Sequence, residues 1–200
     1  TAKLLIENGT DINANDKDGV TDLMQASENG NLETVKDLVE RKRVNINAKD
    51  EDGYTSLMYA SFNGNLEIVK YLVENGADVN ARVDNDWTAL EFASGKGHLE
   101  IVKYLIENGA DINAEDNIDW TALIWASYNG HLEIVKYLVE NGAEIDYYID
   151  KSALMNASYN GHLEIVKYLL ENYADINEKD NNGNTALMYA SISGNLEIVK

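Results

Sequence analysis

The chain has 200 residues, of which 44% are hydrophobic and 26% charged, and its formal net charge is −19. A surface this acidic repels nucleic acid and anionic lipid, so we expect neither nucleic acid nor a membrane as partner, and a protein with a basic surface fits better. No cysteine is present, which excludes disulfides, a thiol nucleophile and sulfur-based zinc sites and favours a reducing compartment, the cytoplasm.

Three markers recur along the chain and predict a repeat array. An apolar segment of the type Leu-Glu-Ile-Val-Lys-Tyr-Leu starts at Leu32, Leu66, Leu99, Leu132, Leu163 and, cut short, Leu196. A glycine precedes it, at Gly30, Gly64, Gly97, Gly130, Gly161 and Gly194, in steps of 34, 33, 33, 31 and 33 residues. A threonine or serine stands nine residues before each glycine, at Thr21, Thr55, Thr88, Thr121, Ser152 and Thr185. A constant period in this range is typical of stacked repeats.

Each repeat predicts two short helices joined by a turn. In one repeat, Thr55 is a suitable N-cap for the first helix, and Gly64 suits the left-handed residue that ends it. The second helix is expected over Leu66 to Asn75, where apolar residues spread too widely for a helix with one buried face. Only stacking on neighbouring repeats buries such a surface, so the sequence predicts an all-α solenoid.

These motifs resemble the ankyrin repeat over the whole chain. The resemblance is carried by the threonine-led first helix, by Gly97-His98-Leu99-Glu100-Ile101-Val102 and by Gly76-Ala77-Asp78-Val79-Asn80-Ala81. It implies stacked helix-turn-helix units with hairpin-like finger loops, and a concave groove of fingers and first helices that binds proteins. We expect a single array over residues 1–200, with a partial repeat over 1–13 and repeats starting near residues 14, 48, 81, 114, 147 and 178, the last truncated.

Several departures from the family pattern predict local changes. The family's Thr-Pro-Leu-His becomes, for example, Thr55-Ser56-Leu57-Met58, and loss of the histidine is expected to leave mostly apolar packing. Asp86 and Asp119 replace a turn glycine, and aspartate tolerates the left-handed conformation better than most residues. Segment 41–46 is one residue longer than its counterparts, and the finger that runs up to Ser152 is two residues shorter.

No residue constellation predicts catalysis or metal binding. His98, His131 and His162 stand one repeat apart, roughly 10 Å, which is too far for shared ligation at about 2 Å. Asparagine fills the same position in other repeats, so a structural role is expected for the histidines. The turn acids before Gly19 and Gly53 miss the spacing of a calcium loop. We therefore predict no enzyme activity, no catalytic residue, no metal site and no cofactor.

Acidic residues concentrate in the fingers. The six finger stretches are residues 11–19, 47–53, 78–86, 111–119, 144–151 and 175–183. They contain 19 of the 35 acids and 5 of the 16 bases, and hence −14 of the net charge of −19. One interpretation is that these are exposed acids that close local turns and keep the array soluble. The other interpretation is an acidic edge that steers a basic partner.

Aromatic residues recur at equivalent positions beside the fingers. One position precedes the threonine, a second lies near the end of the first helix, and Trp125 lies between them. With four acids as a rim, they form the candidate groove: Tyr54, Phe62, Asp84, Asp86, Trp87, Glu115, Asp119, Trp120, Trp125, Tyr128 and Tyr159. Tryptophan and tyrosine dominate interface hot spots, but packing of the tryptophans between repeats is the alternative. Tyr71, Tyr104, Tyr137 and Tyr168, on the second helices, are expected to be stacking contacts.

The predicted function is a non-catalytic scaffold that binds another protein through the groove. The alternative is a structural or self-assembling array, such as a rod or spring within a longer protein. The pattern begins and stops within a repeat, at Thr1 and Lys200, so we expect a piece of a longer protein. Fraying and weak self-association are expected at ends that lack capping repeats.

Overall fold

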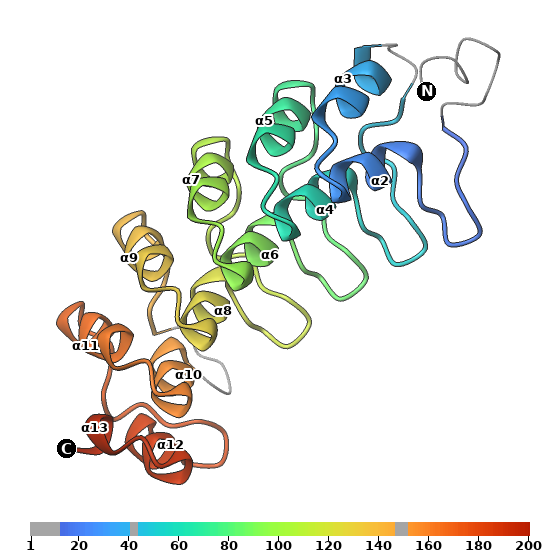
Figure 1. Cartoon of the computed structure of the whole chain (residues 1–200). Coiled ribbons are helices and arrows are strands. Elements are labelled where there is room, and N and C mark those ends of the chain that lie inside the picture. The colour runs from blue at the N-terminus through green and yellow to red at the C-terminus, as the bar shows by residue number, and fades with distance from the viewer. Residues whose placement is uncertain (1–12, 41–43, 147–151) are drawn as a thin grey trace. The chain divides into compact units, whose positions relative to one another are not determined.

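The computed structural model describes residues 13–40, 44–146 and 152–200, which form helices in consecutive pairs (Figure 1). The first helices of the pairs are α2 (Asp22–Glu28), α4 (Ser56–Phe62), α6 (Ala89–Lys96), α8 (Ala122–Asn129), α10 (Ala153–Asn160) and α12 (Ala186–Ser193). The second helices are α3 (Leu32–Glu40), α5 (Leu66–Glu74), α7 (Leu99–Glu107), α9 (Leu132–Glu140), α11 (Leu163–Glu171) and α13 (Leu196–Val199). Within those residues there is no strand, only two isolated bridges, which confirms the all-α class.

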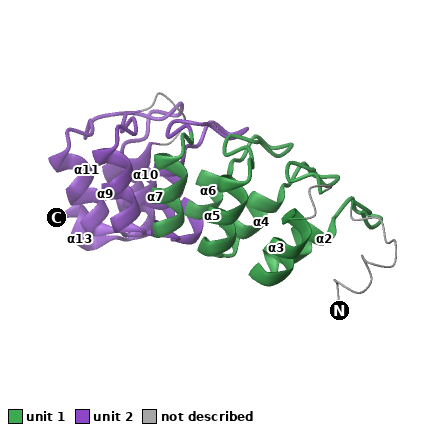
Figure 2. Cartoon of the chain, turned by 90° about the horizontal axis from the view of Figure 1, so that it is seen from above, with its two compact units in different colours: residues 1–93, 100–110 green, residues 94–99, 111–200 purple. Residues whose placement is uncertain are grey.

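The chain divides into two compact units (Figure 2). Unit 1 comprises residues 1–93 and 100–110, and unit 2 comprises residues 94–99 and 111–200. The longer segment at 41–46, the short finger that runs up to Ser152 and the partial repeat over 1–13 were expected from the sequence. Residues 41–43 of the first, 147–151 of the second and 1–12 of the third lie outside the described residues. The expected division into one array of repeats remains a prediction.

The threonine or serine before the first helix caps it in five of the six repeats. The side-chain oxygen of Thr21, Thr55, Thr88, Ser152 or Thr185 accepts the backbone N–H three residues further on. Such a cap contributes about 1 kcal/mol, because it satisfies a donor that the helix leaves open. Thr121 differs: its side chain makes no cap hydrogen bond, and its buried hydroxyl has no partner among the described residues.

In three repeats, the residue that replaces the family's histidine also bonds to the cap residue. The backbone N–H of Thr21 donates to Sδ of Met24 at 3.4 Å, and Met58 accepts in the same way at 3.3 Å. In the next repeat the N–H of Thr88 donates to the fully buried carboxylate of Glu91 at 2.6 Å. The expectation of mostly apolar packing was therefore incomplete, because a long side chain at this position reaches back over the helix start.

Glycines in the left-handed conformation end the first helices and leave room for a side chain of the next repeat to pack closely. Gly130 and Gly161 terminate α8 and α10 with φ of 82° and 79°. A Cβ atom on Gly130 would lie 2.6 Å from Cε1 of His162, and one on Gly161 would lie 2.8 Å from Oδ1 of Asn195. Glycine is required at these two positions both for its backbone conformation and for the close approach of the following repeat.

Within each unit, the core lies between the helices of a pair and between successive pairs. Each complete second helix contributes a buried trio, such as Ile68, Val69 and Leu72 in α5. Within unit 2, α10 packs against both α8 and α12, and within unit 1, α2 packs against α4. The stacking that the broad apolar surface predicts is thus confirmed inside each unit.

Candidate protein-binding surface

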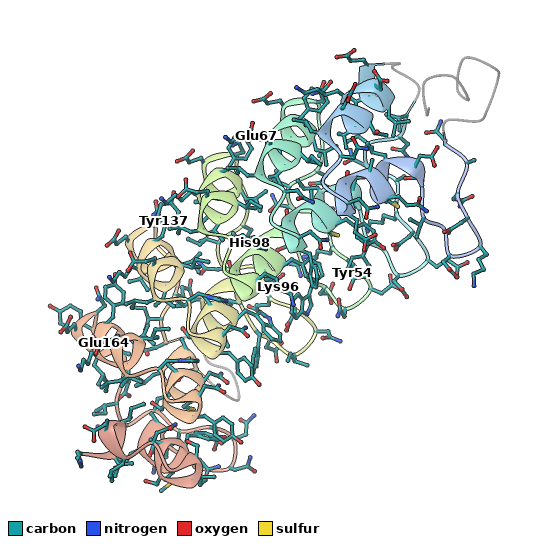
Figure 3. All side chains as sticks on the ribbon, in the orientation of Figure 1. Tyr54, Glu67, Lys96, His98, Tyr137 and Glu164 are labelled. Atoms are coloured by element: carbon teal, nitrogen blue, oxygen red, sulfur yellow. The ribbon has the colours of Figure 1, made fainter. Side chains whose placement is uncertain are left out.

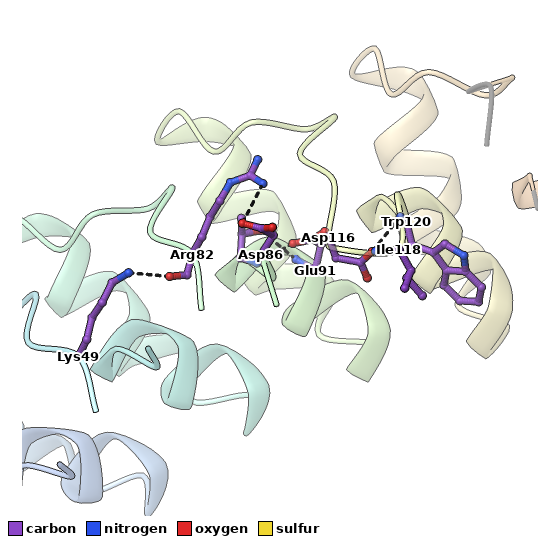
Figure 4. Close-up of polar contacts among 8 residues, drawn as sticks. Lys49, Arg82, Asp86, Glu91, Asp116, Ile118 and Trp120 are labelled. Atoms are coloured by element: carbon purple, nitrogen blue, oxygen red, sulfur yellow. Dashed lines mark hydrogen bonds and ion pairs between the residues drawn. The ribbon is translucent and has the colours of Figure 1, made fainter. Parts of the chain in front are cut away.

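One aspartate organises the turn of four fingers. In the finger at 111–119, Oδ1 of Asp116 accepts the backbone N–H groups of Ile118 and Trp120, each at 2.9 Å (Figure 4). The same two bonds, to residues two and four positions further on, are made by Asp16, Asp50 and Asp180. These carboxylates close the turn, so part of the finger acidity has a structural role.

The second oxygen of this aspartate bonds to an aromatic side chain of the first helix, nine residues further on. Tyr59 donates its hydroxyl to Asp50 at 2.7 Å, and Tyr189 donates to Asp180 at 2.5 Å. Trp125 donates its indole N–H to Asp116 at 3.0 Å. The finger is thereby fixed to the helix that follows it.

Two of the groups in these bonds, Asp180 and Tyr59, have shifted pKa values. Burial raises the pKa of Asp180, but hydrogen bonds from Tyr189, Asn184 and Asn182 outweigh it and lower this pKa to about 2. Burial and the bond to Asp50 raise the pKa of Tyr59 well above its ordinary value. The first shift favours the ionised form of Asp180, and the second favours the neutral form of Tyr59.

The finger at 78–86 lacks this link. Val83 stands in place of the aspartate and Phe92 in place of the aromatic donor, and both side chains are buried. The acceptor and its donor are thus replaced together by apolar packing. The ring of Phe92 becomes the centre of an aromatic cluster in unit 1.

The unit 1 cluster contains three residues predicted for the groove. Trp87 lies 4.9 Å from Phe92 between ring centroids, Tyr54 lies 5.5 Å away and Phe62 5.9 Å away. Trp87 and Phe92 belong to one repeat, whereas Tyr54 and Phe62 come from the preceding one. The alternative of structural packing therefore has support for Trp87, which lies against a buried ring.

The unit 2 cluster contains Trp120, Trp125 and Tyr128. The ring centroids are 4.5 Å apart for Trp120 and Trp125, 5.5 Å for Trp120 and Tyr128, and 6.2 Å for Trp125 and Tyr128. None of the three rings is buried, and Tyr128 is 39% exposed. Tyr159 belongs to neither cluster and contacts the buried ring of Tyr189 edge-on at 6.1 Å.

The four rim acids have different surroundings. Asp84 and Asp119 are exposed, and neither forms an ion pair among the described residues. Asp86 pairs with Arg82 at 3.9 Å, and Glu115 is half-buried. Asp86 and Asp119 have φ of 64° and 60°, which confirms that aspartate takes the left-handed conformation of the glycine it replaces.

The comparison with protein families matches the whole chain. The family described as "Ankyrin repeats (3 copies)" matches residues 1–83, 81–149 and 147–200. The chain belongs to the ankyrin repeat family. Among curated proteins, no match was found. Ankyrin repeats are in general protein–protein interaction modules and typically non-catalytic.

Two histidines of this ankyrin chain, His131 and His162, bond to the backbone of the preceding repeat. Nε2 of His131 lies 3.1 Å from the carbonyl oxygen of Gly95, and Nε2 of His162 lies 3.0 Å from that of Tyr128. Asn65 bonds to preceding carbonyl groups from the same position, at 2.8 and 3.2 Å. For these residues the predicted structural role is confirmed. Over the described residues, no acids and histidines gather in a metal-binding group, and no helix is long and apolar enough to cross a membrane.

The second helices of the ankyrin repeats carry a regular series of ion pairs. Glu67 pairs with Lys70 at 3.0 Å and Glu164 with Lys167 at 2.8 Å, with like pairs in α7 and α9 and between Glu197 and Lys200. Glu67 on α5 and Glu164 on α11 are labelled in Figure 3. Two tyrosines here contact the preceding repeat: the hydroxyl groups of Tyr104 and Tyr168 donate to carbonyl oxygens at 3.5 Å. These contacts confirm the stacking role predicted for those two tyrosines.

Finger acids that close local turns were expected from the sequence, but the bond between a finger aspartate and the first helix was not. Asp116 accepts hydrogen bonds from two residues of the predicted groove, Trp120 and Trp125. The signal that identifies it is the recurrence of aspartate nine residues before an aromatic side chain, as in Asp50 and Tyr59. The joint change to Val83 and Phe92 supports the same pairing.

Proposed function

We propose that this ankyrin array is a non-catalytic scaffold that binds a partner protein through a groove formed by its fingers and first helices. The observation that carries the proposal is an exposed aromatic ring at one equivalent position near the end of three first helices. Phe62 is 40% exposed, Tyr128 39% and Tyr159 46%. Large rings in water forgo burial free energy that an interface would supply, and such residues dominate hot spots.

The charge distribution supports a partner with a basic surface. On the second helices the first-turn glutamates pair with lysines three residues further on, which leaves α5, α7, α9 and α11 with a net charge of only −1 each. The fingers hold most of the excess acid, and Asp84 and Asp119 are exposed at their tips. Long-range attraction of this kind accelerates encounter with a basic protein and disfavours nucleic acid and anionic membranes.

The test is quantitative capture of proteins from a cell extract with matched tyrosine variants. Tyr128→Ala/Tyr159→Ala removes two groove rings, whereas Tyr173→Ala removes a tyrosine that is 91% exposed at the end of α11. We expect the double variant to lose specific partners and Tyr173→Ala to retain them. The purified partner should then bind the double variant at least about 10-fold more weakly. Equal capture by both variants would contradict the proposal.

The apolar surface of α12 and α13 favours the alternative of a self-assembling array. Leu187, Met188 and Ile192 are exposed, although the equivalents of the first two in α10, Leu154 and Met155, are buried. A second copy stacking on this surface would bury them in turn. Sedimentation velocity tests this: the sedimentation coefficient should rise with concentration, and less so in Ile192→Glu. A concentration-independent coefficient would exclude self-assembly.

A further inference from the structure

The finger at 111–119 is the only one of the six finger stretches without a lysine or arginine. It contains Asp111, Glu115, Asp116 and Asp119 and has a net charge of −4, whereas each of the other five has a net charge of −2. The additional negative charge stands directly before Trp120 and thus beside the unit 2 cluster.

The missing base has a defined place in the repeat. Glu115 occupies the position that Lys49, Arg82 and Lys179 occupy in other fingers. In unit 1, Lys49 donates to the carbonyl oxygen of Arg82 at 2.7 Å, and the guanidinium of Arg82 pairs with Asp86 (Figure 4). Asp119 is the equivalent of Asp86, but among the described residues no cation pairs with it. A cation supplied from outside the chain would complete this pattern.

Trp120, which follows Asp119 in the sequence, and the two rings that it contacts are held in place before any partner binds. The carboxylate of Asp116 is 3% exposed and bonds both to the backbone N–H of Trp120 and to the indole N–H of Trp125. Tyr128 packs against both indoles. Rings that are already ordered lose little conformational entropy on binding, which favours affinity.

The chemistry of this cluster suits a cation. The face of an indole or phenol ring attracts a cation, and guanidinium also stacks on such rings. A carboxylate that accepts the indole N–H polarises the ring further in the same sense. Asp119 adds an exposed carboxylate, which a planar guanidinium can engage with two N–H groups.

We infer that Trp120, Trp125, Tyr128 and Asp119 form the docking site for an arginine side chain in a basic segment of the partner. The inference rests on the proposed function and narrows it to one anchor. The equivalent place in unit 1 is less suited, because Arg82 already pairs with Asp86 and Trp87 lies against the buried ring of Phe92.

The inference is tested with three fluorescein-labelled nine-residue peptides in which glycine alternates with arginine, lysine or glutamate. Fluorescence anisotropy measures their dissociation constants for the whole chain and for Tyr128→Ala, Asp119→Lys and Glu140→Lys. Glu140→Lys is the matched control, because it makes the same charge change at an exposed position at the end of α9. Circular dichroism and thermal unfolding establish that each variant is folded.

We expect the arginine peptide to bind at least about 3-fold more tightly than the lysine peptide, and the glutamate peptide not to bind. Tyr128→Ala and Asp119→Lys should each weaken arginine-peptide binding by about 10-fold, against less than 3-fold for Glu140→Lys. Equal weakening by the two lysine variants would show attraction by net charge alone and overturn the inference. Unchanged binding by Tyr128→Ala, or equal affinity for arginine and lysine peptides, would also overturn it.

The outcomes separate this inference from the proposed function. In one outcome, capture of partners depends on Tyr128 and Tyr159 while peptide binding is unchanged by substitutions at Tyr128 and Asp119. That result would support the scaffold proposal and contradict the arginine site. Capture of partners that does not depend on the two tyrosines would contradict the scaffold proposal itself.

Discussion

The carboxylate of Asp116 accepts the indole N–H of Trp125 at 3.0 Å, across nine residues of sequence. The other oxygen of the same carboxylate closes the finger turn through Ile118 and Trp120. One buried side chain thus determines both the shape of the finger and the positions of two candidate anchors. Equivalent links join Asp50 to Tyr59 and Asp180 to Tyr189.

Replacing Asp116 by alanine should destabilise the chain by about 2 kcal/mol, because it leaves three partly buried N–H groups without their acceptor. Urea unfolding followed by tryptophan fluorescence measures the loss. Asp84→Ala is the control and should change the free energy of unfolding by less than about 0.5 kcal/mol, since Asp84 is exposed and its φ is not positive. Equal effects of the two changes would show that the Asp116 link contributes nothing to stability.

The contribution of ionised Asp180 to the free energy of unfolding should disappear at acidic pH. Its pKa is lowered from 3.8 to about 2 in the folded chain, so its ionised form stabilises the fold above the unfolded pKa. This contribution falls as the pH drops from about 4 to about 2. The difference in free energy of unfolding between the wild-type chain and Asp180→Asn, measured at several pH values, should shrink across this window. A constant difference from pH 6 to pH 2 contradicts the assignment.

Glu91→Met should stabilise the chain by about 1 kcal/mol, because a fully buried carboxylate is costly to desolvate. Methionine keeps an acceptor for the Thr88 N–H, as Met24 and Met58 do for their own caps. Denaturant unfolding gives the change in free energy. The reciprocal variant Met58→Glu should be destabilised. If Glu91→Met lowered the stability instead, Glu91 would be making net favourable interactions in the core.

Tyr173→Gly should raise the stability by about 1 kcal/mol, because Tyr173 adopts φ of 70° where other repeats have glycine. The side chain is 91% exposed, so little packing is lost. Gly142→Tyr places the same strain in another repeat and should lower the stability by a similar amount. Thermal and urea unfolding of both variants measure the two effects. Unchanged stability in both would mean that this turn adapts without strain.

Trp87→Ala and Trp120→Ala should separate packing from binding. Trp87 lies against the buried ring of Phe92, so its loss should lower the free energy of unfolding by about 2 kcal/mol or more. Trp120 lies against Trp125, which is half-buried, and Tyr128, which is exposed, so its loss should mainly weaken partner binding, by about 2 kcal/mol. Unfolding and affinity are measured on both variants. A Trp120→Ala variant with reduced stability and unchanged affinity would make this ring a packing residue.

Part of the candidate site was accessible from the sequence. The repeat register places Trp87 and Trp120 at one position, and Phe62, Tyr128 and Tyr159 at another, and the last three are exposed as a binding surface requires. The register does not separate Trp87 from Trp120. That difference arises because Phe92 replaces a polar-tipped aromatic residue and turns inward with Val83.

The sequence by itself determined the period, the helix pairs, most of the helix caps and the left-handed turns at Asp86 and Asp119. These features depend on residues within a few positions of one another, whose backbone preferences and spacing are visible in the chain. The tertiary structure decided that Asp116 binds Trp125, that Met24 and Glu91 reach back to their caps, and which rings are covered. Those outcomes depend on where side chains point once the repeats stack, because hydrogen bonding and burial are set by neighbours in space.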